Sequence, residues 1–387
     1  MTTKGAQGAG PARAGVHQFV PMLHVGDAVG QHTVELQSLL RRRGLPSEVY
    51  VELEDPETAA LTRRLDEYPA AAAPGDLLVY QLATASDMAG WLAERRETLV
   101  VNYHNLTPPE LLAPWDNGLA RHQVRAAEER DRLAPRAALA VAVSEVNRVD
   151  LVAAGYRATA VVPPIVRLLG DAVGGDTAAG DDPATAGGRP RRRGARWLSV
   201  GRLAPNKALE DAMVALLAYR MRHDPAAELV VAGRPAFPVY ARALRRFAAE
   251  LGLAGCVHFE GRVSDLELSD LYRSSDVLVV VSAHEGFCLP IVEAMAHRLP
   301  VVAVASGAVP EVLGGAGVLL DDADPLRLAD AVWSLQSDAP ARAKTVGDGQ
   351  DRVTALRLDQ AGPRLVELLL AARDHRPWPE GVRTGSQ

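Results

Sequence analysis

The chain has 387 residues, 48% of them hydrophobic and 23% charged, which is typical of a globular protein too long for one ordinary core. Its formal net charge of −6 disfavours nucleic acid as the main partner, and its two cysteines, Cys256 and Cys288, exclude a disulfide framework or a zinc cluster. The segment "MTTKGAQGAGPARAG" lacks the apolar core of a signal peptide, and no apolar run is long enough to span a membrane. We therefore expect a cytoplasmic protein, with peripheral membrane contact left open.

Short apolar segments alternate with helical patterns in the first half of the chain. The predicted strands are 16–20, 47–52, 76–81, 98–103, 138–144 and 158–164. The predicted helices are 29–44, 56–67, 86–96, a long stretch that ends near 134, and 146–154. Because the strands are apolar throughout, they are typical of a parallel sheet that is covered on both faces.

A second alternation follows a segment rich in Gly, Ala, Asp and Pro. The predicted strands are 196–201, 227–233, 256–261, 276–282, 299–305 and 317–320. Helices are predicted between them, for example at 207–222, 237–251 and 265–273, and Ser264 is expected to cap the last of these. Pro363 is expected to open a final apolar helix.

The two alternations predict a chain of two doubly wound α/β domains. The expected divisions are a first domain (1–167), a linker or loop (168–195), a second domain (196–350), a C-terminal helical segment (351–374) and a polar tail (375–387). Ligands of open parallel sheets bind outside the carboxyl ends of the strands, so the strand-to-helix loops hold the candidate residues.

The loop "SVGRLAPNKALEDA" (199–212) carries two cations. Arg202 lies in the loop and Lys207 at the start of the next helix, with Asn206 as its expected N-cap. Two cations beside free helix N–H groups suit a pyrophosphate. A solvated loop with two ordinary cations remains the alternative for this segment alone.

The loop "HEGFCLPIVEAM" (284–295) carries two carboxylates. Pro290 is expected as the first helical residue, which puts Glu285 in the loop and Glu293 about one turn inside the helix. A carboxylate at such a place can accept hydrogen bonds from sugar hydroxyls, and an acidic residue often binds the ribose of a nucleotide. The preference of acidic residues for helix N-termini explains Glu293 but not Glu285.

Two loops of the first domain hold weaker candidates. His104 follows the strand 98–103 directly and is expected to face the interdomain cleft, although a structural role is the alternative for a single histidine. Gly26 and Gly30, after the first strand, could let the backbone approach a ligand. No G-x-G-x-x-G follows a strand, which disfavours a dinucleotide oxidoreductase.

The ordered motifs "VGRLAPNK", "HEGFCLPIVEAM" and "SGAVPEV" resemble those of the family 4 retaining glycosyltransferases. The resemblance implies the GT-B fold, in which two Rossmann-like domains face an interdomain cleft. It also implies that Arg202 and Lys207 hold the donor diphosphate and stabilise it as the leaving group. Glu285 would lie near the donor sugar and Glu293 would bind the ribose.

The same resemblance implies roles for further residues. The backbone at Gly286, Phe287, Cys288 and Leu289 would contact sugar hydroxyls and phosphate, and Arg262 and Val263 in "FEGRVSD" would meet the base. His104 would lie near the transferred sugar, Gly30 would belong to the first donor loop, and the helix from Pro363 would return to the first domain. The chain departs from the family at Cys288, where many members have glycine, and at Asp27-Ala28, where the family has a Gly-Gly pair.

The leading hypothesis is a hexosyltransferase that acts in carbohydrate or glycoconjugate biosynthesis. The resemblance implies a donor of the GDP-mannose or UDP-hexose type, retention at the anomeric carbon, no metal or other cofactor, and an unknown sugar, lipid or small-molecule acceptor. Another GT-B enzyme, such as an epimerase or a phosphorylase, is one alternative. A non-catalytic two-lobe protein that binds sugars or nucleotides is the other.

Overall fold

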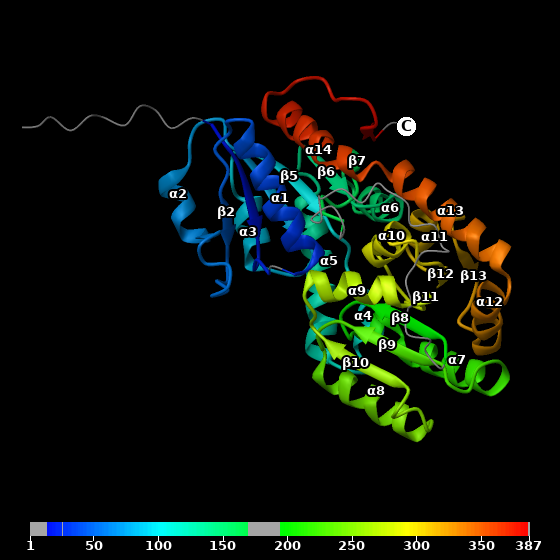
Figure 1. Cartoon of the computed structure of the whole chain (residues 1–387). Coiled ribbons are helices and arrows are strands. Elements are labelled where there is room, and N and C mark those ends of the chain that lie inside the picture. Colours follow the sequence, from blue (N-terminus) through cyan, green and yellow to red (C-terminus); the bar gives the residue numbers. More distant parts are fainter. Residues whose placement is uncertain (1–13, 25, 169–193, 386–387) are drawn as a thin grey trace, which may run out of the picture. The chain divides into compact units, whose positions relative to one another are not determined.

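The computed structural model describes residues 14–24, 26–168 and 194–385. The chain forms two compact units (Figure 1). Of the described residues, the first unit takes in 14–24, 26–106, 122–166 and 358–385, and the second takes in 107–121, 167–168 and 194–357. Most of the segment predicted as a linker, 169–193, lies outside the described residues.

The first unit is built around a parallel sheet. Its strands are β1 (Val16–Val20), β2 (Val49–Val51), β3 (Arg63–Arg64), β4 (Leu77–Leu82), β5 (Thr98–Tyr103), β6 (Leu139–Ala142), β7 (Ala158–Val161) and β14 (Arg383–Thr384). Within the described residues they are ordered β14-β7-β6-β5-β4-β1-β2-β3. Only β14 runs antiparallel to its neighbour in this sheet as described.

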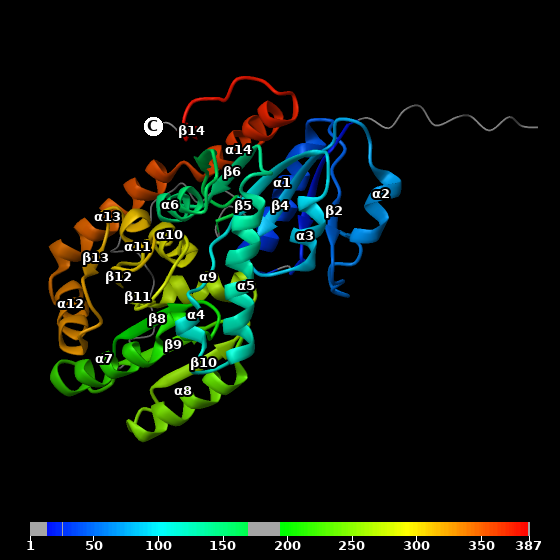
Figure 2. The same ribbon diagram turned by 180° about the vertical axis from the view of Figure 1, so that it is seen from behind.

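Helices cover both faces of the first sheet. They are α1 (Ala28–Arg42), η1 (Leu65–Glu67), α2 (Tyr68–Ala71), α3 (Asp87–Ala93), α5 (Asn117–Leu133), α6 (Glu145–Ala153) and α14 (Leu358–Arg373). Leu40 of α1 and Leu365 of α14 pack in one core with Val100. Leu92 of α3, Leu133 of α5 and Leu151 of α6 pack in the other core. The helices α3 and α5 can be followed in Figure 2. Burial on both faces explains the uninterrupted apolar strands.

The helix predicted at 56–67 is wrong. The segment forms turns, followed by β3 and the short η1, because its two large apolar residues, Leu61 and Leu65, are too few to bury a helix of this length against the sheet. Arg63 pairs with Tyr50 instead and so extends the sheet, and the Thr58 hydroxyl donates to the Leu23 carbonyl at 3.0 Å.

Pro363 does not open the last helix. The helix α14 begins at Leu358, and Pro363 lies inside it. Arg357, with a left-handed φ of 48°, interrupts the helical backbone between α13 and α14. A proline removes one helical hydrogen bond. Buried residues on both sides of it, such as Ala361 and Leu365, hold α14 against the first unit and offset that loss.

The second unit holds a second parallel sheet. Its strands are β8 (Arg196–Val200), β9 (Glu228–Ala232), β10 (Val257–Gly261), β11 (Val277–Val280), β12 (Val301–Val304) and β13 (Val318–Leu320). In the part of the chain that is described, they are ordered β10-β9-β8-β11-β12-β13 and all run parallel. The two doubly wound α/β sheets predicted from the sequence are therefore confirmed.

Helices also cover both faces of the second sheet. They are α4 (Pro109–Leu112), η2 (Pro205–Lys207), α7 (Leu209–Arg222), α8 (Pro238–Glu250), α9 (Asp265–Ser274), α10 (Leu289–Ala296), α11 (Val309–Leu313), α12 (Pro325–Ser337) and α13 (Ala339–Leu356). One core joins α7, α8 and α12 to the sheet, while α9 contacts β8 and α10 contacts β11 and β12. Residues 107–121, which include the first turn of α5, belong to this unit, and the rest of α5 belongs to the first. Here the centroid of the Trp115 ring lies 4.8 Å from that of Tyr240.

Candidate active site

The strand order of the second sheet reverses between β8 and β11. These strands are neighbours, and later strands are added outward from each of them in opposite directions. The loops after two such strands diverge and leave an opening at the carboxyl edge of the sheet, where α/β proteins bind ligands. The loop after β8 carries Arg202 and Lys207, and the loop after β11 carries Glu285 and Cys288. The topology thus brings together the two loops that the sequence marked.

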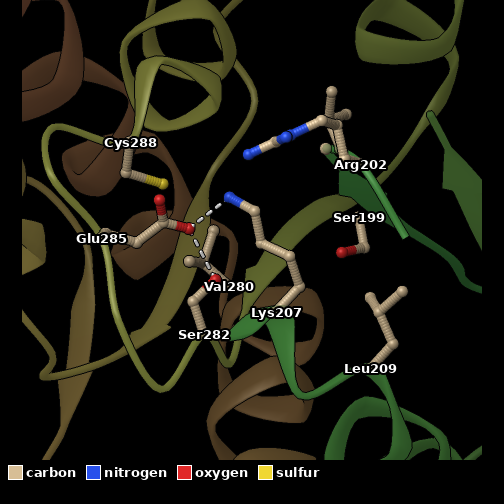
Figure 3. Close-up of a pocket in the computed structure, with 10 residues that line it drawn as sticks. Ser199, Arg202, Lys207, Leu209, Val280, Ser282, Glu285 and Cys288 are labelled. Atoms are coloured by element: carbon tan, nitrogen blue, oxygen red, sulfur yellow. Dashed lines mark hydrogen bonds and ion pairs between the residues drawn. The ribbon is translucent and has the colours of Figure 1, made fainter. Parts of the chain in front are cut away.

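A small pocket lies at this reversal point. Figure 3 shows that Arg202, Lys207 and Glu285 direct their side chains into the same space. The pocket is lined by Ser199, Val200, Gly201, Arg202, Lys207, Leu209, Val280, Ser282, Glu285 and Cys288. Two cations, one carboxylate and two hydroxyl groups in one recess suit a ligand that has both negative charge and hydroxyls.

Lys207 and Glu285 form an ion pair in the pocket. The Lys207 Nζ lies 2.6 Å from the Glu285 Oε1, and the Ser282 hydroxyl donates to the same oxygen at 2.6 Å. Burial is the largest influence on the pKa of Lys207 and lowers it, but the neighbouring groups, chiefly the Glu285 carboxylate, together raise that pKa above its usual value. The lysine is therefore a fixed positive charge at neutral pH.

The segment "SGAVPEV" supports the Glu285 loop through its backbone. The Ala308 N–H donates to the Glu285 carbonyl at 3.0 Å, and the Ser306 hydroxyl donates to the Ser282 carbonyl. A Cβ at Gly307 would lie 2.2 Å from that Glu285 carbonyl oxygen. In the sequence this segment carries only the family resemblance, and no local pattern marks Ser282, Ser306 or Gly307 as functional.

Asn206 is not the N-cap of the helix that follows it. It lies in η2, and Ala208 precedes α7 with a left-handed φ of 47° and no side-chain cap. The side-chain amide of Asn206 donates instead to the His284 carbonyl at 3.2 Å, and the backbone carbonyl of Asn206 accepts from the Ala283 N–H at 2.9 Å. The residue ties the Lys207 loop to the Glu285 loop, a contact between distant segments that helix statistics do not predict.

Cys288 is the N-cap of α10, so this helix begins at Leu289 and Pro290 is its second residue. The backbone of Cys288 is left-handed, with φ 67° and ψ 63°, which costs a side chain on the order of 1–2 kcal/mol relative to glycine. Burial and the nearby Glu285 carboxylate raise the pKa of its thiol well above the usual value, which keeps the thiol protonated.

Glu293 is held by an aromatic residue, Tyr272, that no sequence motif marks. The buried Tyr272 of α9 donates from its hydroxyl to the Glu293 Oε2 at 2.7 Å, and its ring stacks on His297 at 5.1 Å. Burial raises the pKa of Glu293 to about 7, although the hydrogen bond from Tyr272 opposes this shift. The only sequence signal for Tyr272 is its place on the buried face of the predicted helix at 265–273.

The remaining predicted donor residues precede or begin the helices α9 and α10. Arg262 is exposed and Val263 half-buried, between β10 and Ser264, and Ser264 caps α9 as predicted. Phe287 is buried. Gly286 precedes it in the loop, and Leu289 begins α10.

His104 and Gly30 belong to the first unit. The His104 Nε2 lies 2.7 Å from the Gln81 Oε1, and burial lowers the pKa of His104 to about 4. Gly30 is part of α1, and a Cβ there would lie 1.7 Å from the carbonyl oxygen of His24. The absence of a side chain at Gly30 therefore lets the backbone at His24 pack against α1, and the glycine is needed for this contact within the protein.

In the described part of the chain, no group of three or more His, Cys, Asp or Glu side chains is arranged to hold a metal ion. Among the same residues, the structure contains no helix with the length and apolar character needed to cross a bilayer.

The substitution Glu293→Gln should make the stability of the protein less dependent on pH. The folded pKa of about 7 lies above the usual 4.5, so the folded state keeps a proton that the unfolded state releases. The free energy of unfolding therefore falls as pH rises through this window, and a glutamine avoids that loss. Thermal unfolding at about pH 4.5 and about pH 8 should show a higher melting temperature for the variant than for the wild type, mainly at the higher pH.

The matched control is Glu250→Gln, which changes an exposed glutamate that pairs with Arg246. The melting temperature of Glu250→Gln should differ from that of the wild type by the same small amount at both pH values. An equal effect of Glu293→Gln at both pH values would mean that the Glu293 carboxyl ionises normally.

Comparison with known proteins identifies the family. The model of the glycosyl transferases group 1 matches residues 194–338, which include the pocket. A relative from Thermomonospora curvata, named D-inositol 3-phosphate glycosyltransferase, is 32% identical over 359 residues, which cover 88% of this chain and 83% of the relative. The chain belongs to the group 1 glycosyltransferases. The resemblance stated from its three motifs is confirmed.

Solved structures show the fold of this glycosyltransferase. Sucrose-phosphate synthase from Thermosynechococcus elongatus matches with a TM-score of 0.71 and 20% identity, over 93% of this chain and 100% of that one. Anabaena HepE in complex with UDP-glucose matches with a TM-score of 0.68 and 18% identity, over 92% and 99%. The GT-B fold is therefore confirmed.

Proposed function

We propose that this glycosyltransferase moves a hexosyl group from a nucleoside diphosphate sugar to an acceptor hydroxyl, with retention at the anomeric carbon and without a metal or other cofactor. The observation that carries the proposal is the meeting of Arg202, Lys207 and Glu285 at the reversal point of the second sheet. The donor is of the GDP-mannose or UDP-hexose type. The acceptor is a sugar, a lipid or another small molecule.

Arg202 and Lys207 hold the diphosphate of the donor in this proposal. When the bond between the anomeric carbon and the diphosphate oxygen breaks, the diphosphate keeps the electron pair, and the two cations stabilise the charge that develops. Lys207 is suited to this role because its ion pair with Glu285 keeps it charged in a recess that is largely closed to solvent. The acceptor oxygen then bonds to the anomeric carbon on the face that the diphosphate leaves, and its proton passes to a diphosphate oxygen.

Glu285 orients the sugar in this proposal and does not attack it. Its Oε1 already accepts from Lys207 and Ser282, so a sugar hydroxyl would bind at Oε2, beside the Cys288 thiol. Glu293 binds the ribose, the backbone from Gly286 to Leu289 contacts sugar and phosphate, and Arg262 and Val263 meet the base. We propose that the reaction takes place in the cytoplasm, and a lipid acceptor would add peripheral contact with a membrane.

Release of nucleoside diphosphate tests the proposal. The purified chain is incubated with UDP-glucose, UDP-N-acetylglucosamine or GDP-mannose, each with and without a panel of acceptors. Inositol phosphate belongs in that panel because the relative from Thermomonospora curvata is named for it. One donor should give acceptor-dependent release, and the same nucleotide should raise the melting temperature by mass action. Tight nucleotide binding without turnover on any acceptor would favour a binding protein.

The variant Glu293→Gln should raise the donor KM by about tenfold and leave kcat nearly unchanged, because ribose is bound equally in the ground state and the transition state. Initial rates at varied donor and fixed acceptor measure this. A change confined to the acceptor KM would show that Glu293 does not bind the ribose.

A further inference from the structure

A segment from the first half of the sequence packs in the second unit. Residues 107–121, here called the strap, follow β5 and include the first turn of α5. The chain on either side of them, up to residue 106 and from residue 122, belongs to the first unit. The strap contains none of the donor residues that the motifs predict, so its place in the second unit has no explanation in the proposed function.

One part of the strap contacts the element that carries Lys207. The helix α4 lies against η2, and η2 ends at Lys207, whose ammonium is paired with Glu285 in the pocket. Pro109 is the first residue of α4 and follows Pro108 directly. Two successive prolines restrict the backbone, so the strap offers η2 a stiff surface.

A second part of the strap contacts a tyrosine that holds the next helix. The Trp115 ring packs edge-to-face on the ring of Tyr240, which is buried. The Tyr240 hydroxyl accepts from the Leu209 N–H at 3.1 Å. Leu209 is the first residue of α7, and Ala208 before it has a left-handed backbone and provides no side-chain cap. Tyr240 therefore supplies the acceptor that the start of α7 lacks locally.

The Tyr240 hydroxyl is fixed from a second side. It donates to the Glu210 carboxylate, and burial together with that carboxylate raises the pKa of Tyr240, so the hydroxyl keeps its proton. Tyr240 lies on α8, which means that a tertiary contact holds the start of α7 in place. Only Ala208 separates Leu209 from Lys207, so a shift of Tyr240 that moves the start of α7 also moves the lysine.

We propose that Trp115 is a positioning residue, through which the strap holds Tyr240 and η2 in place and so sets the position of Lys207 at the diphosphate. The part of this proposal that concerns the diphosphate rests on the proposed function. The packing of η2 and α7 does not rest on it. A group that stabilises a transition state acts only when it is well placed, and a displacement of about 1 Å can lower a rate by about 100-fold.

Hydrogen exchange tests the packing without any substrate. The full chain is compared with Trp115→Ala in peptides that cover residues 205–211. The Leu209 N–H loses a well-placed acceptor when Tyr240 shifts, so these peptides should exchange at least about tenfold faster in the variant. The matched control is Phe247→Ala, because Phe247 of α8 is half-buried and packs against the same core. This control should leave exchange in 205–211 unchanged.

Turnover tests the action through Lys207. With UDP-glucose or GDP-mannose as donor, Trp115→Ala should lower kcat by about tenfold, whereas Trp115→Phe, which keeps an aromatic ring, should retain most of the turnover. In the Lys207→Ala background, Trp115→Ala should lower kcat no further, because the group that it positions is already gone. A loss of folded protein would lower kcat by the same factor in both backgrounds, so this comparison separates positioning from instability.

Unchanged exchange in residues 205–211 of Trp115→Ala would overturn the proposal. If that variant does not fold, Trp115→Leu takes its place in both measurements, since leucine fills part of the space without a ring edge against Tyr240. Wild-type kcat, or an equal loss of kcat in both backgrounds, would overturn the action through Lys207. Faster exchange in a protein that turns over neither donor would uphold the packing by the strap and count against the proposed function, so the two failures are distinguishable.

Discussion

Replacing Lys207 by alanine should lower kcat by about 100-fold or more, the usual effect of removing one charge that stabilises a leaving group. The Lys207 ammonium lies 2.6 Å from the Glu285 Oε1, so the substitution also leaves that carboxylate buried without its cation. Breaking such a pair costs roughly 3–5 kcal/mol of folding free energy. Steady-state kinetics together with thermal unfolding measure both effects.

A double variant separates these two effects. Lys207→Ala with Glu285→Gln removes the unpaired charge, so it should regain much of the lost stability without regaining turnover. Lys344→Ala is the matched control, because Lys344 is exposed on α13 and pairs with Asp348 at 2.6 Å. Lys344→Ala should change neither kcat nor the free energy of unfolding. Wild-type turnover in the Lys207→Ala variant would show that Lys207 does not bind the diphosphate.

Replacing Gly307 by alanine should destabilise the second unit and abolish most of the activity. The glycine has a φ of +47°, and a Cβ would lie 2.2 Å from the Glu285 carbonyl oxygen and 2.9 Å from the Glu285 nitrogen. Both contacts are with backbone atoms, so the Glu285 loop itself must shift. We expect a loss of roughly 2–4 kcal/mol in the free energy of unfolding and a large fall in turnover.

The matched control is Gly347→Ala, in the middle of α13. Gly347 is exposed, and a Cβ there would meet no atom within 4 Å. Alanine is the better helix former, so the free energy of unfolding of this variant should rise by about 0.5–1 kcal/mol, and the variant should keep full activity. Chemical denaturation of both variants gives the comparison. Equal stability of the two would mean that the 306–308 backbone does not hold the Glu285 loop.

Local sequence patterns were sufficient for most of the fold. The strand predicted at 98–103 is found with the same bounds, because an apolar segment between turn residues has few other ways to be buried. The patterns failed where local preference was overruled. The segment 56–67 has too few large apolar residues to bury a helix, so it forms turns and a short strand, Arg63–Arg64, at the sheet edge. Pro363 is accommodated because the helix around it is buried.

Much of the candidate site could also be chosen from the sequence, because catalytic residues of parallel sheets lie in strand-to-helix loops. Arg202, Lys207 and Glu285 were selected in this way. Their mutual contact was not, since Lys207 and Glu285 are 78 residues apart and were assigned separate tasks on phosphate and sugar. The supporting residues Tyr272 and Gln81 have no local pattern that distinguishes them from ordinary core residues.

The sequence by itself determined the two α/β domains, the glycosyltransferase family and the loops that carry its polar residues, because each of these is encoded in short contiguous segments. Only the tertiary structure decided which groups meet. The neighbouring positions of β8 and β11 join Lys207 to Glu285, and the positions of β1, β4 and β5 join Gln18, through Gln81, to His104. Contacts of this kind depend on strand order, which is a property of the whole sheet and not of any one segment.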